Sequence, residues 1–371
     1  MPQDPAPWRD RFHFEYAPVL REISALLRLQ TLNSRKIASP KTILIVNCCL
    51  IGDFVVSLPA IAEFLREHPH AETDLIVSPT LAPLAQKLRG IRSVYSAQTV
   101  FRRGAEQAVS GRALNSSYDL VVVLRLSGPA RELLASASYK SIHTCLFPLL
   151  RYGLHLAFSP SRHAKQLADF AFEVFGKSGP RLHRIDACEL FDFSQVAAPG
   201  KPAGRIVLVH TGSGSPLYLW PAAKWVQLLE SLQDQKDLSF VFVGGSEDEA
   251  RTFREISLRT SLPLRSYIRQ YDILQLVMLM RASRLFIGVD SGPRHLAHLV
   301  GLPSVCLLGP GPKSFQPLSD QATVIDVNEC RRCSTFYCPY TPRCVEMISV
   351  EAVARACRFR LGHSLVAPPA S

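Results

Sequence analysis

Three short loops in the second half of the chain combine glycine with hydroxyl or acidic side chains, each directly after an apolar run. They are residues 210–215 (HTGSGS), 243–246 (VGGS) and 290–292 (DSG). Glycine lets backbone N–H groups approach an anion closely, hydroxyls donate hydrogen bonds to it, and a helix that starts there adds its positive end. One such loop is a weak signal, because any strand-to-helix turn favours these residues. Three on one sheet edge predict a site for a diphosphate.

An acidic residue in the first half of the chain, Asp53, follows the apolar run 42–47 within residues 49–55 (CLIGDFV). We expect it in a loop at the end of a strand, where a carboxylate can accept a proton from an attacking hydroxyl. Aspartate is also a favoured N-cap of a following helix. Residue type and spacing leave both interpretations open.

Four of the ten cysteines are clustered rather than scattered. Cys330, Cys333, Cys338 and Cys344 follow the spacing C-x2-C-x4-C-x5-C. One short loop with this spacing can bring four sulfur atoms around a tetrahedral ion, so the cluster predicts a structural site for zinc or iron. Reduced thiols that line a loop without metal are the alternative.

The loops above need strands and helices to position them. Apolar runs without alternation, at 42–47, 73–77, 120–124, 206–210, 239–243, 284–289 and 304–308, predict buried strands. Helical patterns separate them, for example at 57–67, 221–233, 247–259, 273–282 and 293–300. Uninterrupted apolar strands that alternate with helices indicate parallel sheets covered on both faces. We therefore expect α/β architecture with two Rossmann-like, doubly wound domains that face a cleft, where such sheets bind ligands.

Composition suggests where these domains begin and end. Residues 1–40 form an extension with an amphipathic helix over about 15–32, which either packs on the first domain or contacts a membrane or partner. The first domain is expected at 41–195, a linker rich in Pro, Gly and Ala at 196–205, and the second domain at 206–360, with the cysteine-rich loop at 330–344. Residues 361–371 are a C-terminal tail.

Length and charge limit the function classes. Hydrophobic residues make up 47% of the 371 residues, which is ample for two globular cores. We expect no membrane-spanning segment and no secretory signal, and hence a cytoplasmic location. The net charge of +11 favours acidic partners. Nucleic acid is not expected, because no basic stripe with interleaved aromatics is present. A phosphorylated sugar-lipid at an anionic membrane surface fits the charge.

Seven motifs, in this order along the chain, resemble those of the lipopolysaccharide heptosyltransferases, glycosyltransferase family 9. They are 50–53 (LIGD), 57–60 (SLPA), 220–221 (WP), 289–293 (VDSGP), 295–297 (HLA), 301–303 (GLP) and 308–310 (LGP). The resemblance extends from about residue 41 to 355. It implies a GT-B fold, inverting transfer without a catalytic metal or other cofactor, and a nucleotide-diphosphate sugar donor of the ADP-heptose type.

The resemblance also implies roles for single residues. Asp53 becomes the general base on the acceptor hydroxyl, and Glu249 lies near the nucleotide ribose. The remaining donor-binding residues it implies are Thr211, Gly212 and Ser213 near the phosphates, and Asp290, Ser291, Gly292 and His295 at the start of a helix. His295 could equally be a core-facing residue. Trp220 and Trp225 are expected to pack, and His210 is given no role.

One position departs from the family pattern. Where the family usually has a lysine two residues before Trp-Pro, this chain has Tyr218, which can donate a hydrogen bond but carries no positive charge. Arg294 follows in the first turn of the expected helix, an unusual place for a cation unless an anion binds there. Our hypothesis is that Arg294 replaces the missing charge. An exposed arginine that points away is the alternative.

These observations predict a glycosyltransferase that moves a sugar, heptose by resemblance, onto a lipopolysaccharide core or similar envelope glycan. The acceptor would be an anionic glycolipid at the inner membrane surface, with the protein cytoplasmic or peripheral on that membrane. A transferase of the same fold for another sugar or a protein acceptor is one alternative. A non-catalytic nucleotide-sugar-binding protein is the other, which Tyr218 favours and Asp53 argues against.

Overall fold

The structure of the chain is a computed structural model, and it forms two compact units. It describes residues 37–98, 114, 117–144, 171–172, 174–175, 187–197, 200, 204–235, 237–309, 320–326 and 343–362. Among these residues the first unit ends at Phe193 and the second begins at Ser194. The expected N-terminal helix over 15–32 and three of the clustered cysteines, Cys330, Cys333 and Cys338, lie outside the described residues.

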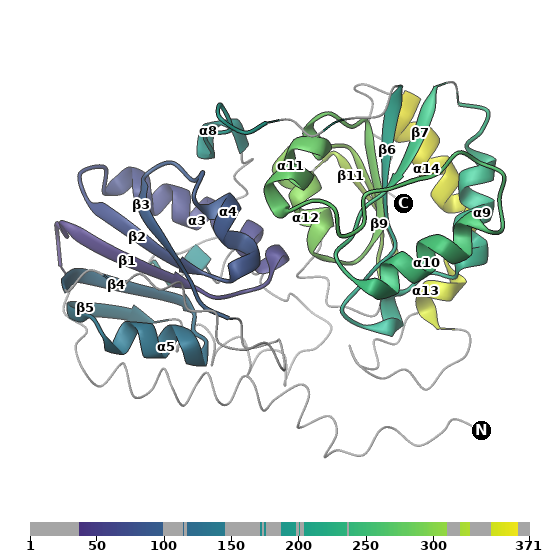
Figure 1. Cartoon of the computed structure of the whole chain (residues 1–371). Coiled ribbons are helices and arrows are strands. Elements are labelled where there is room, and N and C mark those ends of the chain that lie inside the picture. Colours follow the sequence, from purple (N-terminus) through teal and green to yellow (C-terminus); the bar gives the residue numbers. More distant parts are fainter. Residues whose placement is uncertain are drawn as a thin grey trace, which may run out of the picture. The chain divides into compact units, whose positions relative to one another are not determined.

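The first unit is built on a parallel sheet of five strands in the order β3-β2-β1-β4-β5 (Figure 1). Its strands are β1 (Thr42–Asn47), β2 (Glu72–Val77), β3 (Ile91–Ser96), β4 (Ser117–Arg125) and β5 (Ser138–Thr144). Every described pairing in this sheet is parallel. The central strands consist of buried residues along nearly their whole length, as expected for a sheet covered on both faces.

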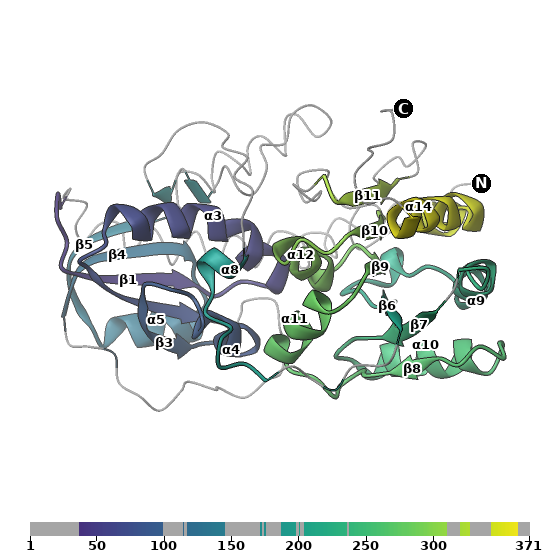
Figure 2. The same cartoon turned by 90° about the horizontal axis from the view of Figure 1, so that it is seen from above.

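Helices α3 (Ile51–Glu67) and α5 (Gly128–Ala135) lie on opposite faces of this sheet (Figure 2). The short helices η2 (Pro79–Leu81), α4 (Ala82–Ala85) and α8 (Ala187–Leu190) complete the described part of the first unit. Helix α3 begins six residues before the expected start at Ser57, so that Asp53 lies in its first turn. The prediction that Asp53 lies in a loop is therefore wrong. The N-cap is Leu50 rather than Asp53, so the N-cap interpretation is wrong as well.

The second unit contains a parallel sheet of six strands in the order β11-β10-β9-β6-β7-β8. Its strands are β6 (Arg205–His210), β7 (Leu238–Phe242), β8 (Arg265–Ser266), β9 (Leu285–Val289), β10 (Ser304–Leu307) and β11 (Ala322–Ile325). Its helices are η3 (Pro216–Tyr218), α9 (Ala222–Ser231), α10 (Glu247–Ser257), α11 (Ile273–Arg281), α12 (Gly292–Leu299), α13 (Cys344–Met347) and α14 (Val350–Gly362).

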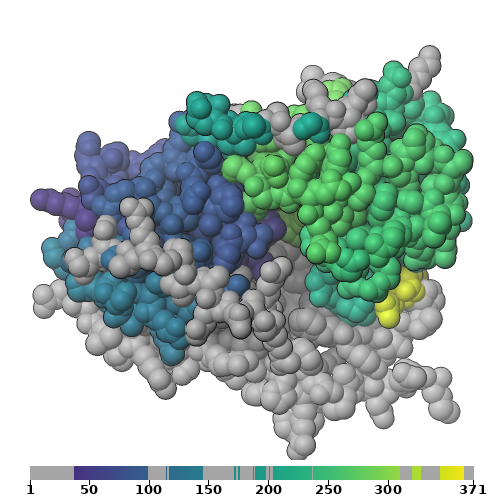
Figure 3. All heavy atoms as spheres, viewed as in Figure 1, coloured from purple at the N-terminus to yellow at the C-terminus, as the bar shows by residue number. Residues whose placement is uncertain are grey.

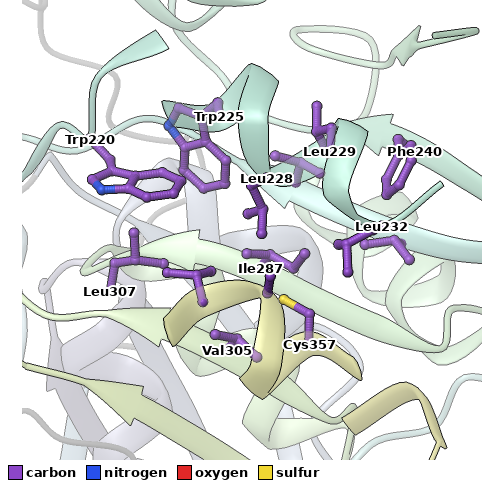
Figure 4. Close-up of a cluster of buried hydrophobic side chains, with 14 of the residues drawn as sticks. Trp220, Trp225, Leu228, Leu229, Leu232, Phe240, Ile287, Val305, Leu307 and Cys357 are labelled. Atoms are coloured by element: carbon purple, nitrogen blue, oxygen red, sulfur yellow. The ribbon is translucent and has the colours of Figure 1, made fainter. Parts of the chain in front are cut away.

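Helices α11 and α12 cover one face of this sheet, and α9, α10 and α14 cover the other (Figure 1). Between the sheet and helices α9 and α14 lies an apolar core in which Trp225, Leu228, Ile287, Val305 and Cys357 are buried (Figure 4). Burial of apolar surface stabilises a fold by about 25 cal/mol per Å², so this layer stabilises the packing of α9 and α14 on the sheet. In a space-filling view, the described atoms that face the viewer lie closely packed in each unit (Figure 3).

Both units thus have the α/β, doubly wound architecture predicted from the alternation of apolar strands and helices, and this fold class is confirmed. Among the described residues, no helix combines the length and the hydropathy needed to cross a membrane.

Candidate functional site

The candidate site residues lie at the carboxyl ends of the strands in both units. In the first unit, Asn47 ends β1, and its side-chain amide donates a hydrogen bond of 2.9 Å to Ser57 Oγ of α3. Ser57 Oγ in turn donates to the carbonyl of Phe54 at 2.7 Å. Both side chains are buried, so this pair holds the first turns of α3 against the end of β1. Asp53 lies in the first of these turns.

The Asp53 carboxyl group has a pKa above the ordinary range for aspartate. Burial raises its pKa, while the charge of Arg125 at the end of β4 and the backbone N–H of Leu50 act in the opposite direction. A carboxylate with a raised pKa is a stronger proton acceptor than an ordinary one. This environment suits a general base.

In the second unit, the three glycine-rich loops all follow strands of one parallel sheet, because β6 pairs with both β7 and β9. Their carboxyl ends therefore share an edge. Ser213 Oγ donates a hydrogen bond to the carbonyl of Asp290 at 3.3 Å, which joins the loop after β6 to the loop after β9. Thr211 is buried in the first of these loops.

Glu249, in the first turn of α10, is a buried acid whose carboxylate contacts the end of β6 and the loop after β7. One carboxylate oxygen, Oε2, accepts hydrogen bonds from Gly245 N at 2.9 Å, Ser246 N at 2.7 Å and Ser246 Oγ at 2.6 Å. The other, Oε1, lies 2.7 Å from His210 Nε2 at the end of β6. Burial raises the pKa of Glu249, but the hydrogen bonds and charge of His210 and the donors of Ser246 outweigh it and lower the pKa to about 2. This carboxylate is ionised throughout the neutral range.

The position of the Glu249 side chain explains why two of the loop positions are occupied by glycine. A Cβ atom at Gly244 would lie 2.5 Å from Glu249 Oε1, and one at Gly212 would also collide with the Glu249 side chain. Gly245, by contrast, faces open space. Gly212 and Gly244 are thus needed because the Glu249 side chain passes between the loops after β6 and β7. The role of Glu249 toward a ribose stays a prediction.

His210 connects Glu249 to the start of α12. Its Nδ1 atom lies 3.1 Å from the hydroxyl of Ser291, the N-cap residue of α12. The Ser291 hydroxyl also lies 3.1 Å from the carbonyl oxygen of Val289. Sequence reasoning gave His210 no role, because its partners Glu249 and Ser291 come close only through the pairing of β6 with β7 and with β9.

Asp290 and Arg294 form an ion pair at the beginning of α12, with Arg294 Nη2 2.7 Å from Asp290 Oδ1. Arg294 is fully buried, so the alternative of an exposed arginine that points away is wrong. Burial raises the pKa of Asp290, and the charge and hydrogen bond of Arg294 oppose that shift. The proposed contact of Arg294 with a leaving group stays a prediction.

Two histidines follow on α12. His295 is buried, and burial together with the charges of Arg294 and His298 holds its pKa well below the usual value. His298 Nε2 lies 3.1 Å from Ser304 Oγ of β10, and burial is the main cause that lowers its pKa to about 3. Both rings are therefore neutral at physiological pH, and any role of His295 in donor binding would be that of a neutral hydrogen-bonding group.

The residues around Tyr218 pack against the end of the sheet. Tyr218 is buried in η3, and its ring packs against the backbone of Gly309. A Cβ atom at position 309 would lie only 2.6 Å from Cδ1 of that ring. Trp220 Nε1 donates to the carbonyl of Ile348 at 3.2 Å, and Lys224 Nζ donates to the carbonyls of Glu346 and Ile348. Trp220 and Lys224 therefore hold the end of α13 in place within the second unit, which confirms the packing role expected of Trp220.

Of the four clustered cysteines, Cys344 alone lies in the described part of the chain, at the start of α13. Within that part, no group of three His, Cys, Asp or Glu side chains has the geometry to hold a metal ion. The first turn of α13 is connected to η3, because Arg343 donates to the carbonyl of Pro216 at 3.2 Å.

Comparisons with known proteins agree with this architecture. Residues 164–342 match the model of Glycosyltransferase family 9 (heptosyltransferase). Lipopolysaccharide heptosyltransferase 1 of Pseudomonas aeruginosa is 23% identical over 333 residues, which cover 81% of this chain and 88% of that protein. Over these residues the chain is similar to glycosyltransferase family 9.

Two solved structures show the same fold. A family 9 glycosyltransferase from Veillonella parvula has a TM-score of 0.64 and 18% identity, covering 87% of this chain and 98% of that one. The E. coli heptosyltransferase WaaC with ADP has a TM-score of 0.64 and 16% identity, covering 86% and 99%. The predicted GT-B fold, with its two Rossmann-like domains, is confirmed.

Proposed function

We propose that the chain is a family 9 glycosyltransferase that transfers heptose from ADP-heptose to a lipopolysaccharide core or a similar envelope glycan, with inversion at the anomeric carbon. The observation that carries the donor assignment is the shared edge of β6, β7 and β9, where three glycine-rich loops meet around Glu249 and Ser291. Backbone N–H groups and hydroxyls in such loops suit a diphosphate. The likeness to a heptosyltransferase that binds ADP supports adenine as the base.

The chemistry divides into two tasks. Asp53 would remove the proton of the acceptor hydroxyl, a task that its raised pKa supports. The donor-binding residues would stabilise charge on the departing diphosphate; they are Thr211, Gly212, Ser213, Glu249, Asp290, Ser291, Gly292, Arg294 and His295. No step in this scheme requires a metal ion or another cofactor.

The net charge of the chain supports an anionic acceptor. The chain carries a net charge of +11, which favours retention at an anionic surface and binding of a phosphorylated glycolipid. We therefore place the reaction at the cytoplasmic side of the inner membrane, with the protein peripheral on it. Residues 41–195 would bind the acceptor and residues 206–360 the donor.

Release of nucleoside diphosphate from a panel of donors, ADP-heptose, ADP-glucose, UDP-glucose and GDP-mannose, with isolated lipopolysaccharide core as acceptor, tests the proposal. We expect release from ADP-heptose that depends on the acceptor and is lost in Asp53→Ala, and a product whose anomeric configuration is opposite to that of the donor. Release from another donor alone would change the sugar assigned. Binding of donors without release would favour a non-catalytic nucleotide-sugar-binding protein, an alternative that the buried Tyr218 supports by bringing no charge to the site.

The cysteine cluster is a separate proposal, which rests on its spacing in the sequence. Cys330, Cys333, Cys338 and Cys344 would hold a structural zinc or iron ion. Metal analysis of the purified protein should find about one ion per chain, and replacement of Cys330 and Cys333 by serine should abolish it. Protein that is free of metal but active and stable would contradict this proposal.

A further inference from the structure

Two buried polar side chains join the end of β1 to the helix that carries Asp53. Asn47 is 1% exposed and Ser57 is 6% exposed, although their neighbours in β1 and α3 are apolar. The Asn47 amide donates to Ser57 Oγ at 2.9 Å, and Ser57 Oγ donates to the carbonyl of Phe54 at 2.7 Å. These two hydrogen bonds therefore run from the sheet to the residue that directly follows Asp53 in the chain.

The position of Asn47 is fixed by the strands on both sides of β1. Asn47 is paired with Val77 of β2 and with Arg125 of β4. The pairing with β4 shifts by one residue between Val46 and Asn47. Irregularities of this kind are rare in parallel pairs and are frequent next to active sites. Asn47 is thus a rigid reference point for the residues that follow β1.

The first turn of α3 lacks the side-chain cap that often fixes the start of a helix. Its N-cap residue is Leu50, which is exposed and makes no capping hydrogen bond. Pro59 lies inside the helix and has no N–H, so one hydrogen bond between the first turns and the rest of α3 cannot form. The part of α3 that carries Asp53 is therefore held less firmly by the helix itself, and the bond between Asn47 and Ser57 ties it to the sheet.

The polarity of these two side chains is not needed for stability. Burial of an amide and a hydroxyl costs free energy, and apolar side chains of similar shape in both places would be about as stable. A hydrogen bond adds direction, because it fixes a distance and an angle between strand and helix, whereas apolar contact is non-directional. A carboxylate that must reach an acceptor hydroxyl needs such a fixed position, since a misplacement of about 1 Å can lower a rate about 100-fold.

We propose that Asn47 and Ser57 are positioning residues for the general base Asp53. Both are too deeply buried to touch a substrate, so they act through the backbone. The Asn47 amide holds the Ser57 hydroxyl, and the Ser57 hydroxyl holds the carbonyl of Phe54, next to Asp53. Their role rests on the proposed function, because it requires Asp53 to act as the base on the acceptor hydroxyl.

The double variant Asn47→Leu/Ser57→Ala replaces both polar groups by apolar ones, and its transfer from ADP-heptose to isolated lipopolysaccharide core tests the proposal. We expect the midpoint of thermal unfolding to stay close to that of the unsubstituted chain, while kcat falls about 10- to 100-fold. KM for the donor should be unchanged, because Asp53 belongs to the first unit and the donor-binding residues to the second. An unchanged kcat in this variant would overturn the proposal.

Three single variants separate positioning from a structural role, and they decide the matter if the double variant does not fold. Ser57→Ala should lower kcat about tenfold. Ser57→Thr should keep the kcat of the unsubstituted chain, because a threonine hydroxyl can also bond to a carbonyl three residues earlier in a helix. Tyr118→Phe removes a different buried hydrogen bond of the first unit, the one of 2.7 Å to Asp74 near the amino end of β4. It should lower thermal stability without changing kcat.

Two results would contradict positioning. One is a Ser57→Ala variant with the kcat of the unsubstituted chain, and the other is an equal loss of kcat in Tyr118→Phe. Asp53→Asn distinguishes this failure from failure of the proposed function. If the unsubstituted chain transfers no sugar, or if Asp53→Asn keeps full turnover, the assignment of Asp53 and the roles of Asn47 and Ser57 are overturned together. If Asp53→Asn loses turnover while Ser57→Ala keeps it, only the positioning role is overturned.

Discussion

The two units each carry one notable carboxylate near the carboxyl ends of their strands, and the two carboxylates have opposite pKa shifts. Asp53 lies in the first turn of α3 and has a raised pKa, because burial outweighs the charge of Arg125. Glu249 lies in the first turn of α10, and hydrogen bonds with His210 and Ser246 outweigh burial and lower its pKa to about 2. Helix position is the same in both, so the local donors make the difference.

The contrast indicates a division of labour. A carboxylate that accepts four hydrogen bonds or ionic contacts is held in place and has little basicity left, which suits a residue that positions others. A carboxylate with a raised pKa can take up a proton in a reaction. Pairs of acids whose environments move their pKa values apart often identify acid and base roles.

Asp53→Asn should lower turnover about 100- to 10,000-fold, because the amide cannot accept the acceptor proton. Donor affinity should change little, since Asp53 belongs to the first unit and the donor-binding residues to the second. Steady-state rates and calorimetric donor affinity measure the two effects. Asp248→Asn, the same chemical change at a well-exposed site on α10, is the matched control and should leave both unchanged. Equal turnover in the two variants would remove Asp53 from catalysis.

Arg294→Met should destabilise the second unit by about 3–5 kcal/mol, because it leaves the largely buried Asp290 carboxylate without its ion-pair partner. Chemical denaturation followed through the buried Trp225 measures this effect. The double variant Asp290→Asn/Arg294→Met should recover part of the loss, since the uncompensated charge is gone. If Arg294→Met bound the donor and turned over as well as the unsubstituted chain, the hypothesis that Arg294 supplies the missing leaving-group charge would be wrong.

Much of the fold could be predicted from the sequence, because its central strands are almost entirely buried and read as unbroken apolar runs. The strand over 42–47 was predicted with the bounds that it has, and β4, β6, β7, β9 and β10 within a few residues. Strand β5 was not predicted, because its sequence SYKSIHT mixes polar residues with few apolar ones. Helix α14 was not predicted either, although Val353 and Cys357 are buried in its contact with the sheet.

The candidate site was harder to predict, because its contacts depend on pairing between distant strands. The loops around Thr211 and Ser291 were recognised by composition, but the link between them through His210 joins residues 81 positions apart. His210 was given no role, because it ends an apolar strand and no local pattern marks its partners. Arg294 was placed in the first turn of its helix correctly, but its burial and its pairing with Asp290 follow only from the packing of α12.

Gly244→Ala should destabilise the second unit by about 1–3 kcal/mol, because the new methyl group collides with the held Glu249 carboxylate. The neighbouring Gly245→Ala is the matched control and should be nearly neutral, since nothing lies within 4 Å of the added Cβ atom. Thermal unfolding measures both. The effects of Gly244→Ala and Glu249→Ala should not add in the double variant, because removal of the carboxylate also removes the collision. Additive effects would show that Glu249 is not held between the loops.

Arg125→Met should have the smallest effect, a shift of the acidic limb of the rate–pH profile to higher pH. Asp53 acts as a base only when ionised, so its pKa sets the pH below which activity falls. The charge of Arg125 lowers that pKa against the effect of burial, and its removal should therefore raise it further. We expect turnover well above this limb to stay within about threefold, since the carboxylate is still ionised there. A limb that stays in place, or moves to lower pH, would show that a group other than Asp53 controls it, and the contrast between the two carboxylates would then have no catalytic meaning.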